Sequence, residues 1–499
     1  MTGTEVVLGV DIGTSSSKGV LVTLDGRILR TATREHTVQR PAPGHVEMDG
    51  EIWWREFQSI AAELTSGTAE TVIAVGVSGM GPCVLLADEA GNALRPAILY
   101  GVDTRATEQI DRLNRQLGAG EIFARCGSML SSQAVGPKLA WVAENEPEVW
   151  NRARKLFMPA SWLAFKLTGE YLLDFHSASQ CTPLFDSVAL DWYSPWIAAI
   201  APDLELPRLR WPAELAGRTT AELVGIPAGT PVIIGTIDAW SEAVSVGAQT
   251  PGDLMLMYGT TMFLVLTLDS SLSERSMWGT VGAFEGTRNL AGGMATSGAV
   301  TAWLSDLTGG DYATLTAEAA ASGVGAGGII MLPYFAGERT PIQDPDARGT
   351  IAGLTLETTR GDLYRAALEA TAFGVRHNVE TLGRAGANAR RVVAVGGGTQ
   401  GDLWTQIVSD VTGLTQEIPT VTIGASFGAA FLAAGLVAKP DILEWNPTAR
   451  TVRPTPATRA TYQDFFSSYL ALYPATADIS HHLAEFQRRA ESATRKEQP

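Results

Sequence analysis

The sequence has 499 residues, 45% of them hydrophobic, and its 53 acidic and 37 basic side chains give a formal net charge of −16. A chain of this length exceeds one hydrophobic core, so we expect two or three packed domains, and its negative charge disfavours nucleic acid and anionic lipid as partners. The three cysteines lack CxxC spacing, which argues against a disulfide framework and a structural zinc site.

Neither a basic and apolar leader nor an apolar run of about 18 residues occurs, so we expect a cytoplasmic protein without a membrane span.

Apolar strand-like runs alternate with amphipathic stretches along the chain, which predicts an α/β fold. Strands are expected at 71–77, 231–234, 328–332 and 391–395, and helices at 51–65, 104–117, 361–384 and 402–411. Asp49 stands where it would cap the first of these helices. The stretch 440–499 is rich in Pro, Thr and charge, and it predicts a packed tail with helices near 459–472 and 478–492 and a frayed end at 495–499.

The first turn of the chain, within 6–25, combines a carboxylate with small hydroxyl residues. An apolar strand ends at Asp11, and Gly13, Thr14 and Ser15 follow before a second apolar strand begins. Backbone amides and hydroxyls in such a turn can hold phosphate oxygens. The carboxylate would repel a bare polyphosphate but favours a magnesium ion between them, because hard cations prefer oxygen ligands. Asp11 is therefore either a metal anchor or an ordinary turn former.

The segment 253–269 repeats this pattern, with Gly259, Thr260 and Thr261 in a turn between two apolar strands. Two further segments, 230–248 and 391–413, each run from a buried strand through glycine into a helix. The repetition predicts two related halves. A boundary is expected near Pro251 and Gly252, because a Pro-Gly pair favours a loop. Two such turns that face each other can bind one polyphosphate from both sides.

Two other stretches carry candidate functional residues. Asp238 follows a buried strand and a Gly-Thr turn and directly precedes a helix, so it is either the N-cap of that helix or a proton acceptor for an incoming hydroxyl. Gly397 and Gly398 follow the strand at 391–395, where they allow either the approach of a ligand to the backbone or a close helix–strand crossing. Their spacing departs from the G-x-G-x-x-G pattern, which disfavours dinucleotide binding.

These segments resemble the FGGY carbohydrate kinases of the actin-like ATPase superfamily, and within them the xylulokinase-like branch. The resemblance runs from about residue 6 to 436 and is most specific in GTIAGLTLETTRGDLYRAALEATAFG (349–374), which matches the second signature of the family. PKLAWVAENEP (137–147) resembles the first signature around Lys138 and Trp141, although Val135 stands where that pattern has Pro, Ser or Thr. HVEMDGEIWW, LPYFAGERTP and GGGTQGDLWTQIVSDVTG also look like family segments.

The resemblance implies two related actin-like (ribonuclease H-like) ATPase domains with a nucleotide cleft between them. They would be a sugar-binding domain at 1–249 and a nucleotide-binding domain at 250–440, followed by a helical tail at 441–499 packed on the domains. The implied activity is transfer of the γ-phosphate of ATP to a hydroxyl of a small sugar, with Asp238 as general base and Asp11 near Mg²⁺. A homodimer is also suggested.

The resemblance further implies which residues surround each substrate. Those around the nucleotide are Gly13, Thr14, Ser15, Gly259, Thr260, Thr261, Gly298, Ala302, Gly397, Gly398 and Gly401. Those on the sugar side are Gly81, Pro82, Asp103, Arg105 and Asp238. For Asp103 and Arg105 the alternative is an exposed ion pair at a helix start, a common and weak interaction.

One departure from the family bears on the acceptor. Met80, Gly81 and Pro82 stand where typical xylulokinases carry Gln-Met-His, so a histidine donor to a sugar hydroxyl is absent. D-xylulose is the expected acceptor, with ribulose, a polyol or gluconate as alternatives. A more distant alternative is a non-catalytic actin-like ATPase that changes conformation with the bound nucleotide. Such a protein needs no sugar pocket, so Asp238 and the loops 78–83 and 100–106 favour the kinase. A sugar-sensing regulator would need a DNA-binding part, and no basic helix-turn-helix pattern is found.

Overall fold

The structure is a computed structural model that describes residues 4–67, 69–223 and 225–496. It contains two compact units. Unit 1 comprises the chain up to Pro251 with Thr267–Asn289 and Val421–Pro447, and unit 2 comprises Gly252–Leu266, Leu290–Thr420 and the chain from Thr448 onward. The functional division at 1–249, 250–440 and 441–499 stays a prediction. Residues 497–499, in the end predicted to fray, lie outside the described residues.

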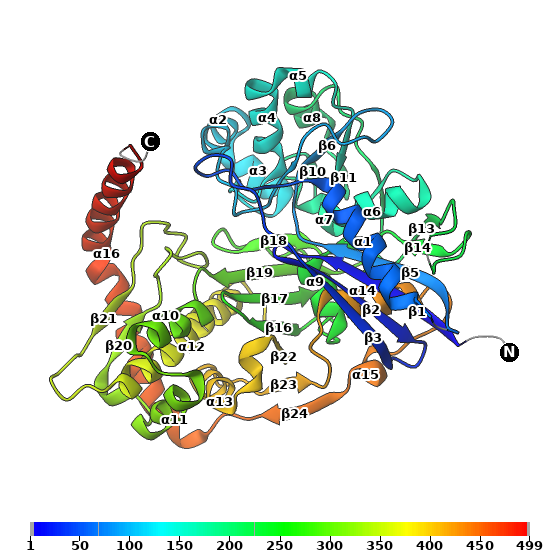
Figure 1. Ribbon diagram of the computed structural model, residues 1–499. Coiled ribbons are helices and arrows are strands. Elements are labelled where there is room, and N and C mark those ends of the chain that lie inside the picture. Colours follow the sequence, from blue (N-terminus) through cyan, green and yellow to red (C-terminus); the bar gives the residue numbers. More distant parts are fainter. Residues whose placement is uncertain (1–3, 68, 224, 497–499) are drawn as a thin grey trace. The chain divides into compact units, whose positions relative to one another are not determined.

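The central sheet of unit 1 has the strand order β13-β14-β5-β1-β2-β3, and β15 also pairs with β5 (Figure 1). Its strands are β1 (Glu5–Ile12), β2 (Ser16–Thr23), β3 (Ile28–Glu35), β5 (Thr71–Gly79), β13 (Leu215–Arg218), β14 (Pro231–Ile233) and β15 (Thr236–Ile237). β1 runs antiparallel to β2 and parallel to β5, so Asp11 lies opposite Lys18 on one side and Ser78 on the other. Thr236 of β15 pairs with Ser78. The carboxyl ends of β1, β5 and β15 therefore meet at one edge of the sheet.

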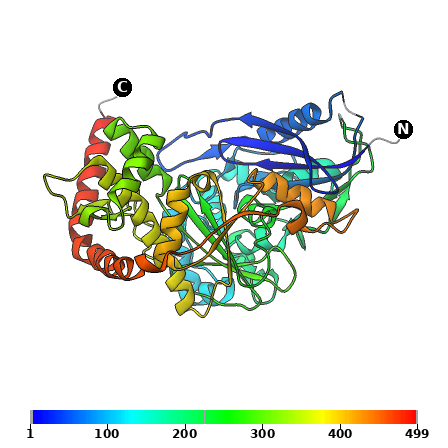
Figure 2. The same cartoon turned by 90° about the horizontal axis from the view of Figure 1, so that it is seen from below.

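Helices cover both faces of this sheet. α14 (Ala425–Ala434) packs on the face of Gly9 and Gly76, where a Cβ on either glycine would lie 2.0 Å from a backbone oxygen of α14. α1 (Gly50–Thr65) packs on the other face, where a Cβ on Gly19 would lie 2.2 Å from Ile60. Figure 2 shows α14, in orange, against the strands drawn in blue. Glycine at these positions lets the helices approach closely, and α9 (Asp238–Ser245) packs against α14.

Short strand pairs and helices make up the rest of unit 1. The pairs are β4 (Glu47–Met48) with β7 (Ala97–Ile98), β6 (Leu85–Ala87) with β8 (Lys155–Phe157), β9 (Leu172–Asp174) with β12 (Arg208–Arg210), and β10 (Phe185–Asp186) with β11 (Asp191–Trp192). The other helices are α2 (Thr107–Leu117), α3 (Ala119–Cys126), α4 (Val135–Asn145), α5 (Pro147–Trp150), α6 (Pro159–Thr168), α7 (Phe175–Ser179), α8 (Ser194–Ile200) and α15 (Ile442–Trp445). As predicted, Asp49 caps α1, because its side chain accepts a hydrogen bond from the Glu51 amide.

A second sheet, most of whose strands belong to unit 2, repeats the pattern of the first. Its order is β18 (Trp278–Val281), β19 (Arg288–Met294), β17 (Met262–Leu268), β16 (Asp253–Tyr258), β22 (Arg391–Val395), β23 (Gln416–Pro419) and β24 (Thr448–Val452). β16 pairs antiparallel with β17 and parallel with β22, as β1 does with β2 and β5. The next pairings, β22-β23-β24, match β5-β14-β13 in direction. The prediction of two related α/β halves is confirmed.

The remaining elements of unit 2 are mainly helical. They are α10 (Gly298–Thr308), α11 (Tyr312–Ser322), α12 (Arg360–Arg384), α13 (Asp402–Thr412) and α16 (Arg459–Lys496), with β20 (Ile330–Leu332) paired to β21 (Thr350–Ala352). None of the helices in the described part of the chain is long and apolar enough to cross a membrane.

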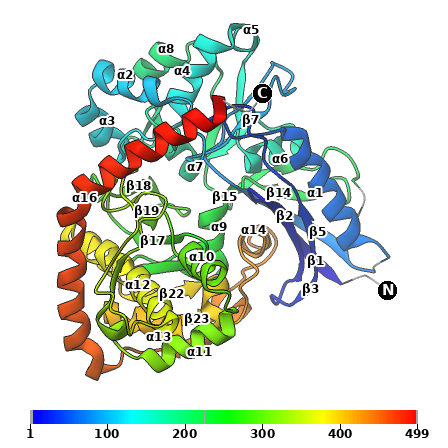
Figure 3. The same cartoon turned by 60° about the vertical axis from the view of Figure 1, so that its left-hand side comes forward.

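The tail forms one helix, α16, where the sequence predicted two, near 459–472 and 478–492. Pro474 lies inside this helix and removes one backbone donor. Tyr462 and Tyr469 before the proline and Ala484 after it are buried, and this packing outweighs the missing hydrogen bond. Figure 3 shows α16 changing direction along its length, as a proline inside a helix commonly causes.

Candidate active site

The carboxyl ends of β1, β5 and β15 bring three polar side chains of unit 1 together. Asp11 is the last-but-one residue of β1, and its Oδ1 accepts a hydrogen bond of 2.8 Å from the hydroxyl of Ser78 on β5. β15 ends at Ile237 beside the end of β5, and Asp238 begins α9 immediately afterwards. Two carboxylates that are 227 positions apart in the numbering thus reach the same edge of one sheet.

Asp238 does not cap α9, so the alternative of a structural N-cap is wrong. The N-cap position is held by Ile237, and Asp238 is the first helical residue. Its Oδ1 accepts 2.7 Å from the Ala239 amide, the next residue along, whereas a capping side chain accepts from an amide two or three positions on. Within the described residues, no other hydrogen bond reaches the Asp238 carboxylate. One carboxylate oxygen therefore remains available to a hydroxyl donor.

The electrostatic environment raises the pKa of both carboxyls. Burial raises the pKa of Asp11 to about 6, against opposing contributions from the Ser78 hydroxyl and the Lys18 charge. Burial also raises the pKa of Asp238 to about 7, and the nearby charge of Asp11 adds to this. An aspartate whose pKa lies near neutrality is well matched to accept a proton from a hydroxyl and release it afterwards.

Glu242 is a third carboxylate in this cluster, and it was not among the residues predicted from the sequence. It lies one helical turn after Asp238 on α9, and burial together with the charges of Asp11 and Asp238 raises its pKa to about 8. A Cβ on Gly424, which precedes α14, would lie 2.5 Å from Glu242 Oε2, so the side chain reaches the start of that helix. The i to i+4 spacing from Asp238 was the signal that could have identified it.

The first Gly-Thr turn is held from two sides. The Gly13 amide donates to the Ser16 carbonyl over 3.0 Å, which closes the turn. His36 contacts the Gly13 carbonyl through Nε2 at 3.1 Å and the Glu56 carboxylate through Nδ1 at 2.9 Å. Thr14 Oγ1 lies 2.9 Å from the Tyr100 hydroxyl, while Ser15 is exposed. No sequence pattern links His36 or Tyr100 to this turn, because both come from distant segments.

The loop that contains Gly81 and Pro82 lies against the strand that precedes Asp238. The Met80 amide donates 2.7 Å to the Ile12 carbonyl at the end of β1. A Cβ on Gly81 would lie 2.6 Å from the Ile237 side chain. The backbone at this predicted sugar-side position is therefore directly next to the residue before Asp238.

Asp103 and Arg105 form a buried pair, so the alternative of an exposed ion pair is wrong. Their side chains are 0% and 1% exposed. Arg105 donates to Asp103 Oδ2 over 2.7 Å, and the same oxygen accepts from the Val46 amide over 2.6 Å. Arg105 also pairs with Glu47 at 2.7 Å. These contacts fix the conformation of the loop 100–106.

Lys138, from the stretch that resembles the first family signature, supports the same loop. Its side chain is buried, and Nζ donates to the carbonyls of Leu99 and Tyr100 over 2.6 and 2.9 Å. Burial lowers the pKa of this ammonium to about 8. Lys138 thus holds the backbone at Tyr100, whose hydroxyl reaches the first Gly-Thr turn.

Unit 2 contains the second Gly-Thr turn and the start of α10. The Gly259 amide donates to the Thr261 carbonyl over 3.1 Å, and the Gly298 amide donates to the Gly259 carbonyl over 3.0 Å. A Cβ on Gly298 would lie 2.7 Å from that carbonyl oxygen, so a larger residue would push the turn and the helix apart. Thr260 is exposed, and Ala302 lies half-buried on α10 one turn further on. The hydroxyl of Ser297 is buried and has no hydrogen-bond partner among the described residues.

Several glycines follow β22 in the same unit, and the backbone at Gly397 and Gly401 is exposed. Gly396 adopts φ +95°, and a Cβ there would lie 2.5 Å from the Tyr258 carbonyl oxygen at the end of β16. Gly398 packs on Trp404, whereas Gly397 and Gly401 have no atom within 4 Å of a Cβ position. The run therefore combines one close backbone crossing, at Gly396, with an accessible surface at Gly397 and Gly401.

The described residues contain no group of three or more His, Cys, Asp or Glu side chains placed to hold a metal ion. A magnesium ion here would have few protein ligands, which is usual for Mg²⁺ because it keeps several waters and binds through one or two carboxylates and substrate phosphates.

Comparisons with known proteins agree with this arrangement. The model of the FGGY family of carbohydrate kinases, N-terminal domain, matches residues 6–245, and that of the C-terminal domain matches residues 254–436. A xylulose kinase of Escherichia coli is 28% identical over 481 residues, covering 93% of this chain and 98% of that protein. A glycerol kinase of Nocardia farcinica is 32% identical over 478 residues, covering 90% and 94%.

The crystal structure of xylulose kinase from Rhodospirillum rubrum superposes with a TM-score of 0.89 at 30% identity, covering 95% of this chain and all of that one. The two family domains together span most of the chain, and the fold and the carboxylates at the strand ends are consistent with them. The chain therefore belongs to the FGGY family of carbohydrate kinases.

Proposed function

We propose that this protein transfers the γ-phosphoryl group of ATP to a hydroxyl of a small sugar, with D-xylulose as the expected acceptor. Membership in a family of carbohydrate kinases and similarity to xylulose kinases over almost the whole chain support this assignment. Ribulose, a polyol and gluconate stay alternatives. The predicted cytoplasmic location, homodimer and nucleotide cleft between domains stay predictions from the sequence.

The observation that carries the proposal is the position, the hydrogen bonding and the raised pKa of the Asp238 carboxyl. Its carboxylate stands at a strand end with one oxygen bonded only to the Ala239 amide, and its pKa is raised to about 7. We assign it the role of general base, which accepts the proton of the acceptor hydroxyl as the oxygen attacks the γ-phosphorus. The bond from that phosphorus to the bridging oxygen breaks, and ADP leaves. Positioning and charge neutralisation provide most of the remaining rate enhancement.

Asp11 fits the role of a magnesium anchor. The Ser78 hydroxyl and the Lys18 charge partly compensate its buried negative charge, and a cation beside it would compensate it further. Bound Mg²⁺ would neutralise charge on the phosphate oxygens. The residues that carry the role in this chain are Asp11 as the oxygen ligand, directly or through water, and Ser78, which orients it.

The turns at Gly13–Ser15 and Gly259–Thr261 are proposed to bind phosphate oxygens of ATP through amides and hydroxyls. Gly298, Ala302, Gly397, Gly398 and Gly401 are proposed to surround the adenosine, in line with the open backbone at Gly397 and Gly401.

On the sugar side, Gly81 and Pro82 are proposed to contact the acceptor, while Asp103 and Arg105 shape the loop that does so. The absence of a histidine after Met80 leaves the choice of sugar to other donors of this loop.

A panel of acceptors tests the proposal. ATP turnover with Mg²⁺ would be measured with D-xylulose, D-ribulose, L-xylulose, L-ribulose, glycerol, erythritol and gluconate, each against a no-acceptor blank. We expect one of them, most strongly D-xylulose, to stimulate turnover by at least about a hundredfold, since most of the rate depends on a positioned acceptor. Turnover that is unchanged by every compound would contradict the kinase assignment and favour a nucleotide-driven switch.

A further inference from the structure

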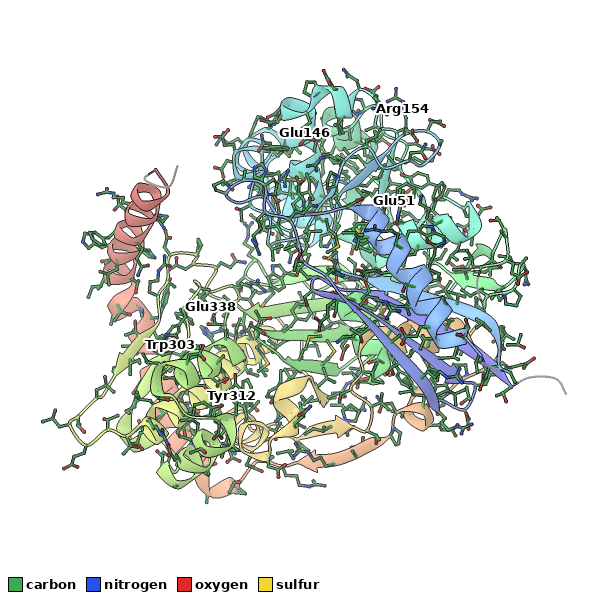
Figure 4. All side chains as sticks on the ribbon, in the orientation of Figure 1. Glu51, Glu146, Arg154, Trp303, Tyr312 and Glu338 are labelled. Carbon is green, nitrogen blue, oxygen red and sulfur yellow. The ribbon has the colours of Figure 1, made fainter. Side chains whose placement is uncertain are left out.

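The segment LPYFAGERTP contains a buried carboxyl that the proposed reaction does not use. Glu338 lies in the loop between β20 and β21 of unit 2, and it is only 5% exposed (Figure 4). Two backbone hydrogen bonds close this loop on itself. The Glu338 amide donates to the Asp344 carbonyl over 2.8 Å, and the Asp344 amide donates to the Glu338 carbonyl over 2.9 Å. The loop is thus a defined structure that holds the side chain in place.

Glu338 and Thr340 attach this loop to the end of β19. Glu338 Oε1 accepts 2.8 Å from the Ala295 amide and 2.7 Å from the Arg339 amide. Two residues on, the Thr340 amide donates 3.1 Å to the Gly293 carbonyl, and the Gly293 amide donates 2.7 Å to Thr340 Oγ1. The loop therefore contacts the chain at the point where β19 turns toward α10.

The segment held by Glu338 leads directly to the second Gly-Thr turn. After Ala295, the Ser297 and Ala299 amides donate to the Thr260 carbonyl over 2.9 and 3.1 Å. The Gly298 amide donates to the Gly259 carbonyl over 3.0 Å. Three backbone hydrogen bonds thus fix the turn to the start of α10, and the Glu338 carboxyl is bonded three residues before Gly298.

The other end of the loop is bonded to the C-terminal helix. Asp344 Oδ2 accepts from the Tyr473 hydroxyl and contacts His481 Nε2, each at 2.7 Å. Both partners lie on α16. The loop is therefore attached both to the end of β19 and to α16, and the second attachment limits movement of Glu338.

We propose that Glu338 is a positioning residue for ATP: it fixes the Ala295 amide and, through the start of α10, the place of the Gly259–Thr261 turn. The inference rests on the proposed function, because it assumes that this turn binds phosphate. Burial raises the pKa of Glu338 to about 8, and its Oε1 is the acceptor for the Ala295 and Arg339 amides, which an apolar side chain would leave unpaired.

Three variants separate positioning from stability. Glu338→Leu removes the acceptor of both amides, whereas Glu338→Gln keeps one oxygen that can take both, as Oε1 does in the native protein. Glu380→Gln is the control, since that exposed carboxylate pairs with Arg376 on α12 of the same unit. The measurements are calorimetric affinity for ATP with magnesium, KM for the acceptor, kcat and the melting temperature, all on the full chain.

We expect Glu338→Leu to weaken ATP binding about tenfold or more, the loss that one or two hydrogen bonds can cause, with the acceptor KM changed less than about twofold. Glu338→Gln and Glu380→Gln should bind ATP within about twofold of the native protein. Native ATP affinity in Glu338→Leu would overturn the proposal. So would equal losses for ATP and acceptor, or a Glu338→Gln variant as impaired as Glu338→Leu.

If Glu338→Leu does not fold, Glu338→Asp takes its place, because the shorter side chain withdraws the oxygen from the Ala295 amide. It should weaken ATP binding in the same direction, and native affinity in it would again overturn the proposal. A native protein that binds no ATP would instead refute the proposed function, and the two failures are therefore distinguishable.

Discussion

Replacement of Asp238 by Asn separates the catalytic role of this side chain from any structural one. The substitution keeps the size of the side chain and an oxygen that can accept from the Ala239 amide, but it removes the proton acceptor. Loss of a general base typically lowers turnover by about 10²–10⁴. We expect a loss in that range at saturating ATP and acceptor, with unchanged ATP affinity.

The same variant should be more stable than the native protein at alkaline pH. The carboxyl of Asp238 has a pKa of about 7 in the folded state against its ordinary value of 3.8, so the folded state binds more protons between about pH 4 and 7. Native stability therefore falls as the pH rises through this window, and the loss is complete above about pH 7. The difference corresponds to at most about 4 kcal/mol, and we expect about 1–3 because the carboxylate is partly exposed to water.

The assay compares turnover, calorimetric ATP affinity and melting temperature of both proteins at pH 8 and pH 4.5. The account predicts lower turnover together with a higher melting temperature at pH 8, and nearly equal melting temperatures at pH 4.5. Near-native turnover would refute the assignment of the base. A lower melting temperature at pH 8 would show that the charged carboxylate stabilises the fold, contrary to the burial argument.

Three further predictions follow from the same site. In the free enzyme, kcat/KM for the acceptor should fall about tenfold for each pH unit below about 7, because Asp238 must be ionised; a flat profile from pH 5.5 to 8 would contradict this. Asp11→Asn should raise the magnesium concentration needed for half-maximal rate, since it removes the negative charge that attracts the cation, and a native magnesium dependence would make Asp11 a turn former. Tyr100→Phe should lower kcat/KM by up to about tenfold, because it removes the hydroxyl that contacts Thr14 Oγ1; native kinetics would show that this contact does not position the turn.

Hydrophobic periodicity and the repeated Gly-Thr turn were sufficient to predict an α/β fold with two related halves, whereas the actin-like arrangement of the domains was implied by the family resemblance. Both Gly-Thr turns lie between antiparallel strands, and the first strand of each pair runs parallel to a later strand, so the centres of the two sheets repeat the same local pattern. The tail was predicted less well: two helices were expected, near 459–472 and 478–492, and the burial of side chains on both sides of Pro474 explains the single helix α16. Local sequence carries no information on such packing.

Some residues of the candidate site could be predicted from the sequence and others could not. Asp11 and Asp238 follow strands and were identifiable from the sequence, although the choice between cap and base for Asp238 needed the position of Ile237 as N-cap. His36, Tyr100 and Glu338 were not identifiable, because each contacts its turn or strand end through a pairing between distant segments. The burial of Asp103 and Arg105 likewise depends on Glu47 of β4 and on Val46, the residue before it, which come from an earlier segment of the chain.

The most direct test of the central claim is the identification of the product. Native protein and Asp238→Asn would each be incubated with ATP, magnesium and the best acceptor of the panel, and ADP and the phosphorylated sugar would be quantified by phosphorus NMR. We expect one sugar phosphate ester for each ADP with the native protein, and at least about a hundredfold less of both with the variant. Release of inorganic phosphate with no sugar phosphate, or equal ester formation by both proteins, would contradict acceptor-dependent transfer with Asp238 as the base.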